Sequence, residues 1–446
     1  MEILRWRLSN QIANYSGHDL QEYITFISGE MRQTQQSTVN RSVISIPVFA
    51  LSIYIVFTFF PSAYTFFPFL GETRIVLISG AVLLIGYILT ARKYKNDGAW
   101  KNSTMVALIG YFIAITLSLA VSLDRGSTMI LIITNLKYLL VILVMVKIID
   151  SAKRENFILA IFVTCGIGMA VISIVNYGIY GKTFVQGEVV SNRAMAVEVG
   201  LFGDPNDLAM LLNVTLPFIL YYCFTSKYKT LPILGIIIIV CAIILTYSRG
   251  GFLGLCAVTI GFLVLKERNR GRHILLIVLA ALLFWSLAPD SYKNRILTIS
   301  KEAQVDEKLG EYPGRLQAWI ELLPKGMKNP VLGVGAGCSI YIAGTERGDW
   351  VSLHNSFLQV FLESGLIGFI FYVSIFLSQY KQYRYVKRKY SNVLNNNIER
   401  FKFTLLSLLA FAVTAFFLPQ AYSPILYFIS GVTIINTELC NLSRQQ

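Results

Sequence analysis

Residues 289–354 read PDSYKNRILTISKEAQVDEKLGEYPGRLQAWIELLPKGMKNPVLGVGAGCSIYIAGTERGDWVSLH, a long polar segment between two hydrophobic runs. Most other connections between the hydrophobic runs of this chain are far shorter. A loop of this length with its own turn signals is usually functional or a small subdomain. We therefore treat this segment as the part around which the hydrophobic runs are organised.

An apolar repeat inside the segment predicts a helix. Leu316, Trp319, Ile320 and Leu323 recur at helical spacing. The repeat predicts an amphipathic helix that lies on the membrane surface or against the helix bundle. The GVGAG run at 333–337 resembles a dinucleotide-binding loop, but it follows no predicted strand and opens no βαβ unit, which excludes that interpretation. A flexible loop that approaches a ligand or the bundle explains these glycines better.

The composition is that of an integral membrane protein. Of the 446 residues, 55% are hydrophobic and 14% are charged, and the mean hydropathy is +0.59. An ordinary soluble domain holds about 25% charged residues. Apolar runs of about 20 residues, enough for one bilayer crossing, recur from residue 43 to the C-terminus. The sequence predicts an all-α membrane protein with about twelve spans, at 43–60, 75–90, 104–122, 128–149, 157–177, 206–225, 231–247, 251–265, 273–288, 354–378, 403–419 and 424–440.

The distribution of Lys and Arg predicts the topology. Basic residues concentrate in alternate loops, such as 92–101, 266–272 and 381–400, which favours cytoplasmic N- and C-termini. The predicted parts are a cytoplasmic segment at 1–42, spans one to nine at 43–288, an extracytoplasmic loop at 289–353, and spans ten to twelve with a short tail at 354–446. The net charge of +14 is explained by this topology, so nucleic acid is not needed as a partner. The predicted location is the cytoplasmic (inner) membrane, with the functional site on its outer face.

Two ionisable residues fall inside predicted spans, Lys137 and Glu363. Such residues are costly in the membrane and normally face the bundle interior or a wet cavity. Each lies nine residues past the predicted outer end of its span, which places both at about the same depth. A Lys137–Glu363 ion pair and a role in the site are equally favoured.

Two outward turns hold further candidates. Asp204, Pro205 and Asp207 read as an N-cap, a first helical proline and a capping-box residue, which leaves Arg193 and Asn206 without a structural explanation. In the turn YSRGG at 247–251, Arg249 stands beside two glycines. A lone arginine there is most often an interfacial anchor, but the glycines would leave backbone room for a bound phosphate.

Histidine and cysteine usage restricts the chemistry. Of three histidines, only His354 is predicted to face outward, where a neutral imidazole can accept a proton. A capping or interfacial role is the common alternative for one histidine. Of six cysteines, only Cys338 is predicted to face outward, so no outward disulfide is expected, and no Cys/His cluster indicates a metal site.

Four segments occur in a fixed order: GLFGDPNDLAMLLNVTLP (200–217), YSRGG (247–251), GRLQAWIELLPKGMKNPVLGVGAG (314–337) and HNSFLQVFLESGLIG (354–368). Together they resemble the O-antigen ligase and O-antigen polymerase family of bacterial envelope glycan enzymes. The resemblance covers residues 185–375. It implies a GT-C-like helical membrane glycosyltransferase that uses undecaprenyl-diphosphate-linked glycan as donor, without a nucleotide sugar, metal or other cofactor.

The resemblance also assigns roles to residues. Arg249 and Arg315 would hold the diphosphate, and His354 would activate the acceptor hydroxyl. Apart from the resemblance, we expect Arg193, Asn206, Asn355, Lys137 and Glu363 to contribute to substrate binding. The expected partners are the lipid-linked donor, a glycan or lipid-core acceptor, membrane lipid, a flippase and a chain-length regulator. A polymerase is slightly favoured over a ligase in cell-surface polysaccharide (lipopolysaccharide) biosynthesis, and the alternative class is a lipid-linked oligosaccharide transporter or flippase, which predicts internal repeats and interrupted helices.

Overall fold

The computed structural model describes residues 43–66, 69, 73–94, 98–180, 183–185, 188–191, 193–195, 202–265, 271, 274, 315–342, 353–390 and 395–442. Met1–Ser45 and Ile46–Gln446 are separate compact units, and the elements below belong to the second. In chain order they are α3 (Ile46–Phe59), α4 (Ala63–Phe66), α6 (Ile75–Thr90), η1 (Ala91–Lys93), η2 (Gly98–Lys101), α7 (Ser103–Leu117), η3 (Ser118–Val121), α8 (Arg125–Ile148), α9 (Ala152–Tyr180), β1 (Thr183–Val185), β2 (Glu188–Ser191), α10 (Pro205–Thr225), α11 (Thr230–Leu245), α12 (Arg249–Leu265), α16 (Arg315–Gly326), α18 (Ser356–Tyr390), α19 (Asn395–Ala415) and α20 (Pro424–Leu442).

The helices fall where the hydrophobic runs predict them. Every predicted span except 273–288 overlaps one of these helices, and 273–288 lies almost wholly outside the described residues. Five described helices are long and apolar enough to cross a membrane, and four more are shorter and apolar. The twelve-span count stays a prediction. The described elements are helical, as the all-α prediction expects, apart from β1 and β2. These form a short antiparallel pair in which β-branched residues such as Thr183, Val185 and Val189 favour extended backbone.

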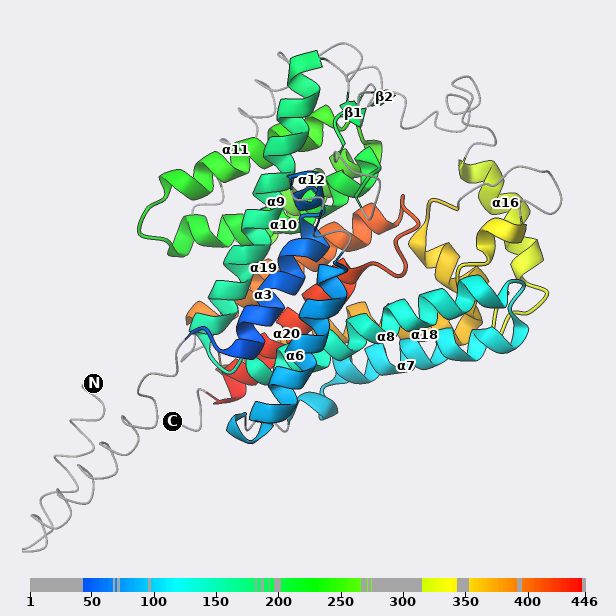
Figure 1. Ribbon diagram of the computed structural model, residues 1–446, viewed down its shortest axis with the longest axis horizontal. Coiled ribbons are helices and arrows are strands. Elements are labelled where there is room, and N and C mark those ends of the chain that lie inside the picture. Colours follow the sequence, from blue (N-terminus) through cyan, green and yellow to red (C-terminus); the bar gives the residue numbers. More distant parts are fainter. Residues whose placement is uncertain are drawn as a thin grey trace, which may run out of the picture. The chain divides into compact units, whose positions relative to one another are not determined.

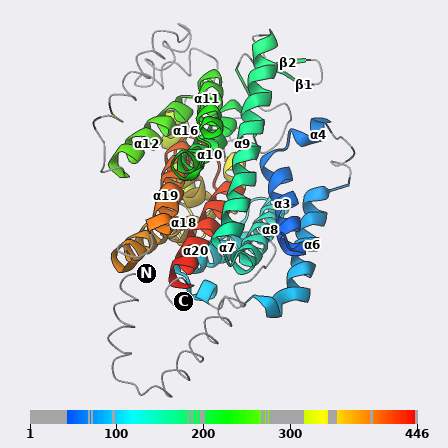
Figure 2. The same ribbon diagram turned by 90° about the vertical axis from the view of Figure 1, so that its left-hand side faces the viewer.

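Two helices form the centre of the bundle. α10 is the most buried of the candidate spans, with 72% of its apolar window inside the protein. It packs against α9, α11, α12 and α19 (Figures 1 and 2). α20 is buried along nearly its whole length and packs against α8, α18 and α19.

α18 lies alongside α7 (Figure 1), and polar side chains fix how the two helices are aligned. The amide of Gln382 donates to Asn102 Oδ1 over 2.5 Å, and the hydroxyls of Thr104 and Ser378 lie 2.9 Å apart. Residues 378–382 of α18 therefore stand level with the start of α7, which leaves the part of α18 before Gly365 beyond the far end of α7.

All six cysteines are free. Cys338 is 0% exposed, and its Sγ lies 3.4 Å from Ser122 Oγ. The cysteine predicted to face outward is therefore shielded by the protein. Labelling of the native Cys338 would not report on topology.

Two exposed lysines at opposite ends of the bundle report the topology instead. Lys328 follows α16, and Lys227 lies between α10 and α11. In a background without other cysteines, we expect Lys328→Cys to react with an impermeant thiol reagent in intact cells. Lys227→Cys should react only after permeabilisation. The reverse pattern would contradict the predicted cytoplasmic N-terminus.

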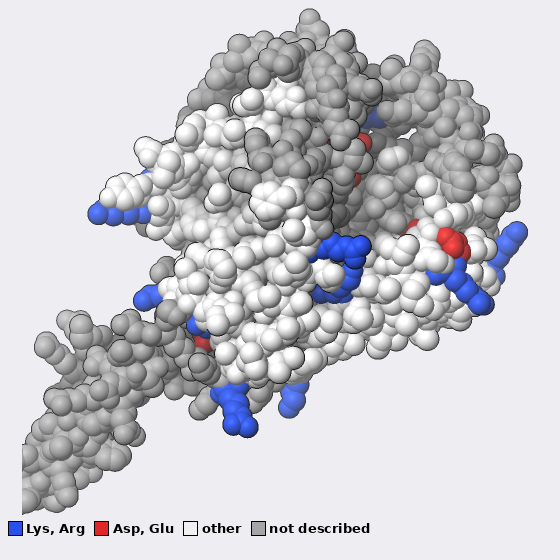
Figure 3. All heavy atoms as spheres, viewed as in Figure 1, with Lys and Arg blue, Asp and Glu red and all other residues white. Residues whose placement is uncertain are grey.

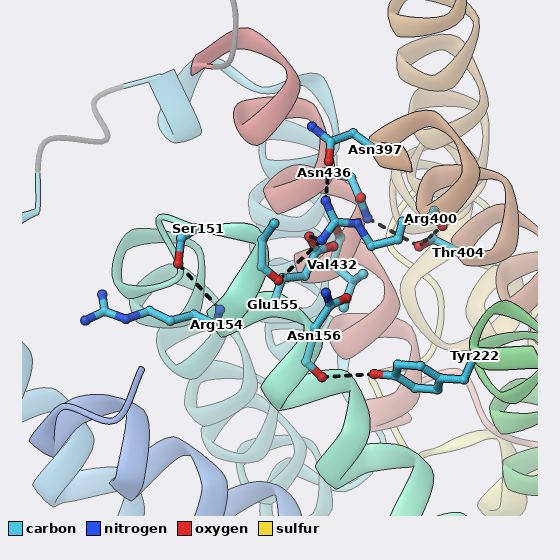
Figure 4. Close-up of polar contacts among 11 residues, drawn as sticks. Ser151, Arg154, Glu155, Asn156, Tyr222, Asn397, Arg400, Thr404, Val432 and Asn436 are labelled. Carbon is cyan, nitrogen blue, oxygen red and sulfur yellow. Dashed lines mark hydrogen bonds and ion pairs between the residues drawn. The ribbon is translucent and has the colours of Figure 1, made fainter. Parts of the chain in front are cut away.

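A buried ion pair joins the helices at the end where α9 and α19 begin and α20 ends. Arg400 Nη1 lies 2.9 Å from Glu155 Oε2, with side-chain exposures of 3% and 2%. Figure 4 shows the two side chains pointing toward each other beside Asn436 of α20. Asn397 also accepts a hydrogen bond from Arg400. The sequence analysis placed Arg400 in a basic cytoplasmic loop and missed this pair, because a charge run does not show which of its members turns inward.

We expect removal of either partner to destabilise the protein strongly, because the remaining charge stays buried. Arg400→Met should lower the free energy of unfolding by about 3–5 kcal/mol, measured by denaturant titration in detergent. The matched control is Lys402→Met, which removes a partly exposed contact to Glu399 at 2.6 Å and should cost less than about 1 kcal/mol. Equal losses for both variants would show that the buried pair is not a special element of the fold.

Candidate functional site

The start of α10 is built around a cap and an arginine. The Asp204 side chain accepts a hydrogen bond from the Asn206 backbone N–H at 2.7 Å, and Pro205 is the first helical residue, as predicted. Arg193 donates to Asn206 Oδ1 at 2.9 Å and to the Thr246 carbonyl at 2.7 Å. Arg193 and Asn206 are therefore in contact, and together they tie the start of α10 to the end of α11.

The turn predicted at 247–251 joins α11 to α12. Tyr247 adopts a left-handed conformation with φ of 49°, and the Ser248 hydroxyl caps α12 by accepting from the Gly251 N–H at 3.0 Å. Arg249 is the first residue of α12 and is 7% exposed. The guanidinium group is thus held at a helix N-terminus and is largely shielded by the protein.

The glycines beside Arg249 serve helix packing, which corrects the expectation of room for a phosphate. A Cβ built on Gly251 would lie 2.6 Å from the Cβ of Ala209 in α10, and one on Gly250 would lie 3.0 Å from Phe417. The space beside Arg249 is therefore filled by α10 and by the segment that follows α19. Close approach of helices is a common reason for glycine in membrane bundles.

His354 precedes the cap of α18. The Asn355 side chain accepts from the backbone N–H groups of Phe357 and Leu358, at 2.9 and 3.0 Å. His354 is half-buried and has a φ of 45°, a conformation that costs energy for a residue with a side chain. Such strain persists where the surroundings fix it, and it clusters at functional sites.

The segment between α19 and α20 connects the start of α18 to the start of α12. The Ser356 hydroxyl donates to the Leu418 carbonyl at 2.6 Å and accepts from the Gln420 N–H at 2.8 Å. Phe417, in the same segment, packs against Gly250. We call the end of the bundle where α10, α12 and α18 begin the site end. Three helix N-termini, each a favourable place for an anion, lie around this segment.

α16 is the helix predicted inside the long loop, and Arg315 is its first residue. The Trp319 indole donates to the Leu353 carbonyl at 2.6 Å, next to His354, and its ring meets Phe416 edge-on with centroids 5.9 Å apart. Leu322 is buried, but Ile320 is 65% exposed. α16 contacts α18 through Trp319, Leu322 and Gly326, and Ile320 lies outside that contact.

α18 is broken at Gly365, which has φ of 64° and ψ of −166°. The break frees the carbonyls of Leu362 and Glu363, and these accept from the N–H groups of Val334 and Gly335, each over 3.0 Å. On the other side of the break, Leu366 N–H donates to the Pro330 carbonyl at 2.8 Å. The glycine-rich loop thus pairs with backbone that an unbroken helix would have satisfied internally.

Glu363 holds the rest of this loop. Its carboxylate is 1% exposed and accepts from Ser339 Oγ at 2.5 Å, Tyr422 Oη at 2.6 Å and the Gly337 N–H at 2.8 Å. The amide of Gln359 lies 3.4 Å away. These donors leave the carboxyl group fully engaged by its own chain. Sequence reasoning missed Tyr422 and Ser339, since neither belongs to a charged or motif-like pattern.

The same loop is fixed to the start of α8. Tyr341 Oη donates to Asp124 Oδ2 at 2.9 Å, and the Leu123 N–H donates to the Val334 carbonyl at 3.0 Å. Hydrogen bonds from the hydroxyls of Ser127 and Tyr341 lower the pKa of Asp124. The loop is therefore level with the site-end termini of α7 and α8.

The predicted Lys137–Glu363 ion pair is wrong. Lys137 is exposed on α8, whereas Glu363 is buried, and no ion pair joins them among the described residues. The assumed equal depth fails because the part of α18 that packs along α7 begins near the Gly365 break. Glu363 thus stands level with the start of α8, while Lys137 lies 12 residues farther along α8, about 18 Å at the helical rise.

The structure brings Arg193 and Asn206 into contact and places Arg249 at the same site end. Residues 416–420 connect this group to the start of α18, where His354 and Asn355 lie. It separates Lys137 from this group. Within the described part of the chain, no group of three or more His, Cys, Asp or Glu residues is arranged to hold a metal ion.

Double-mutant cycles distinguish the partners of Glu363. Glu363→Gln turns an amide toward buried donors and should cost about 1–3 kcal/mol or more of unfolding free energy. Combined with Ser339→Ala, the two losses should fall short of additivity by more than about 0.5 kcal/mol, because the residues are in contact. Combined with Lys137→Met, the losses should add. Unfolding in detergent measures both cycles, and coupling of Glu363 to Lys137 would restore the original pairing.

Comparison with known proteins adds an independent finding. Residues 234–373 match the sequence model of a family described as O-Antigen ligase. This range includes Arg249, Arg315, His354 and Glu363. No curated protein sequence matches the chain significantly. With its apolar helices, the chain is a multi-pass membrane protein in which residues 234–373 are similar to the O-antigen ligase family.

Proposed function

We propose that this protein transfers a glycan from undecaprenyl diphosphate to a hydroxyl group of an acceptor sugar. The observation that carries the proposal is the meeting of Arg249 with the N-terminal regions of α10 and α18 at one end of the bundle, within or beside the segment that matches the family. The proposed location of this end is the outer face of the cytoplasmic membrane, as the distribution of Lys and Arg predicts.

Binding of the donor diphosphate is assigned to Arg249 and Arg315. Arg249 is a permanently charged group, largely withdrawn from water at the N-terminus of α12, where the helix dipole also favours an anion. A guanidinium group can form two parallel hydrogen bonds to phosphate oxygens. Arg315, at the first position of α16, is the proposed second contact. Two arginines at the developing charge of the leaving group would take the role that a metal ion has in other transferases.

Activation of the acceptor hydroxyl is assigned to His354. In the proposed step, the acceptor oxygen bonds to the anomeric carbon while the bond from that carbon to the diphosphate oxygen breaks, and the hydroxyl proton passes to the imidazole. A single direct displacement inverts the anomeric configuration. The strained backbone of His354, φ 45°, fixed between Trp319's contact to Leu353 and the Asn355 cap, supports a positioned group.

The transporter alternative predicts paired, interrupted helices that line a substrate cavity. α18 is interrupted at Gly365, but its freed carbonyls are taken by Val334 and Gly335 of the same chain. The Glu363 side chain is likewise satisfied by Ser339, Tyr422 and Gly337. The interruption therefore anchors a loop, which agrees better with a transferase.

We expect His354→Ala to reduce glycan transfer by about 10²–10⁴-fold in kcat, the usual loss for a positioned base, with little change in donor binding. Arg249→Lys and Arg315→Lys should instead raise the donor KM, because lysine keeps the charge and loses the planar fork. The measurement is transfer by purified variants from a defined lipid-diphosphate donor, with a chelator present.

The matched control is Lys328→Gln, an exposed basic position just after α16, which should keep wild-type kinetics. Near wild-type turnover by a folded His354→Ala protein would reduce His354 to a helix-end residue and remove this mechanism. Glycan profiles of a deletion strain separate the two finer activities: single repeats on lipid indicate a polymerase, whereas full-length unattached chains indicate a ligase.

A further inference from the structure

Lys137 remains unexplained by the site at the start of α18. It lies midway along α8, an apolar helix long enough to cross a membrane, and its side chain is exposed. Its exposed neighbours on α8 are apolar, with Ile130 at 66% and Ile133 at 46%. An isolated ammonium group on such a surface is costly unless an anion accompanies it.

The burial pattern of α8 shows what lies next to Lys137. Lys137, Val141, Val144 and Ile148 share one face of the helix at spacings of four, three and four residues. The last three are 6%, 4% and 0% exposed, and α3 and α6 pack against α8. Lys137 is therefore the residue at which this cover stops.

The cover stops because α6 is shorter than α8. The far ends of the two helices are tied together by Arg154, which donates to the Ile148 carbonyl at 3.0 Å and stacks 5.8 Å from the ring centre of Tyr94, just past η1. α6 has 16 residues and α8 has 24. Because the C-terminal ends of the two helices lie together and α6 is shorter, the N-terminus of α6 lies part of the way along α8. The residue that precedes α6 is Arg74.

Arg74 is also exposed. Because Cβ atoms tilt toward the helix N-terminus, the Lys137 side chain leans toward the site end, which is where α6 begins. Neither side chain meets a carboxylate among the described residues. Figure 3 shows a group of basic side chains near the middle of this face, with further charged side chains toward its edges.

We propose that Arg74 and Lys137 form a lateral binding site for the diphosphate group of a polyprenyl lipid, distinct from the site at Arg249. Two neighbouring cations match the charge of a diphosphate, whereas a phospholipid with one phosphodiester would leave a positive charge uncompensated at the apolar surface. The exposed apolar side chains of α6 and α8, including Leu77 and Ile130, offer a surface to the hydrocarbon tail. This inference rests on the proposed function, since it assigns the donor a place to bind before transfer.

The test measures bound undecaprenyl diphosphate by native mass spectrometry of the full-length protein. Arg249→Gln/Arg315→Gln should still retain the lipid, and adding Arg74→Gln/Lys137→Gln should remove it. In kinetics, Arg74→Gln/Lys137→Gln alone should raise the donor KM about tenfold or more, the effect of losing charge-assisted contacts, at unchanged kcat. Arg74→Lys/Lys137→Arg should restore binding.

Arg125→Gln/Lys328→Gln is the matched control, with the same loss of charge at two exposed positions, and should bind as wild type. Retention of the lipid by the quadruple variant, or its displacement by phosphatidylglycerol at equal concentration, would overturn the lateral site. If the wild-type protein binds no undecaprenyl diphosphate, the proposed donor itself is wrong. This result differs from failure of the lateral site alone, in which the wild-type protein still binds the lipid.

Discussion

The structure depends on satisfying backbone polar groups that cannot reach water. The break at Gly365 frees carbonyl and N–H groups of α18, and residues 330–335 supply their partners. An unpaired backbone group in a membrane costs several kcal/mol, so irregular backbone is tolerated only where protein covers it. This constraint joins the glycine-rich loop, α18 and the α7–α8 connection into one unit. Gly333, Gly335 and Gly337 all have positive φ, the conformations that let the loop follow the break.

The distribution of charge follows the same rule. The Glu363 carboxyl group is held by neutral donors, and Glu155 is paired with Arg400 at the opposite end of the bundle. The Arg249 guanidinium group lies at the start of α12, next to the positive end of that helix dipole. In the proposed function, this placement would let Arg249 and the helix dipole both act on the donor diphosphate in a region of low dielectric constant.

Structural features that depend on one helix or turn could be predicted from the sequence. Features that depend on contacts between several elements could not. Run length located the helices, and local chemistry predicted the Asp204 cap, the turn at 247–251 and the helix that begins near Arg315. The depth of Glu363 was not predictable, because it depends on a break that only the loop stabilises. The packing role of Gly251 and the inward turn of Arg400 depend on α10 and on α9, and nothing within either local sequence encodes those neighbours.

The break also explains how the position of His354 is controlled. The part of α18 from Ser356 to Ser364 is not a continuation of the long helix, so helical geometry alone does not set its direction. Its place is fixed by Ser356 against residues 418–420 and by Leu362 and Glu363 against the loop. A change in that loop can therefore displace the imidazole without touching it. In the proposed reaction His354 is the proton acceptor, and its precise placement would matter because small displacements of reacting groups cost large factors in rate. The long segment thus contributes to the site through backbone contacts as well as through Arg315.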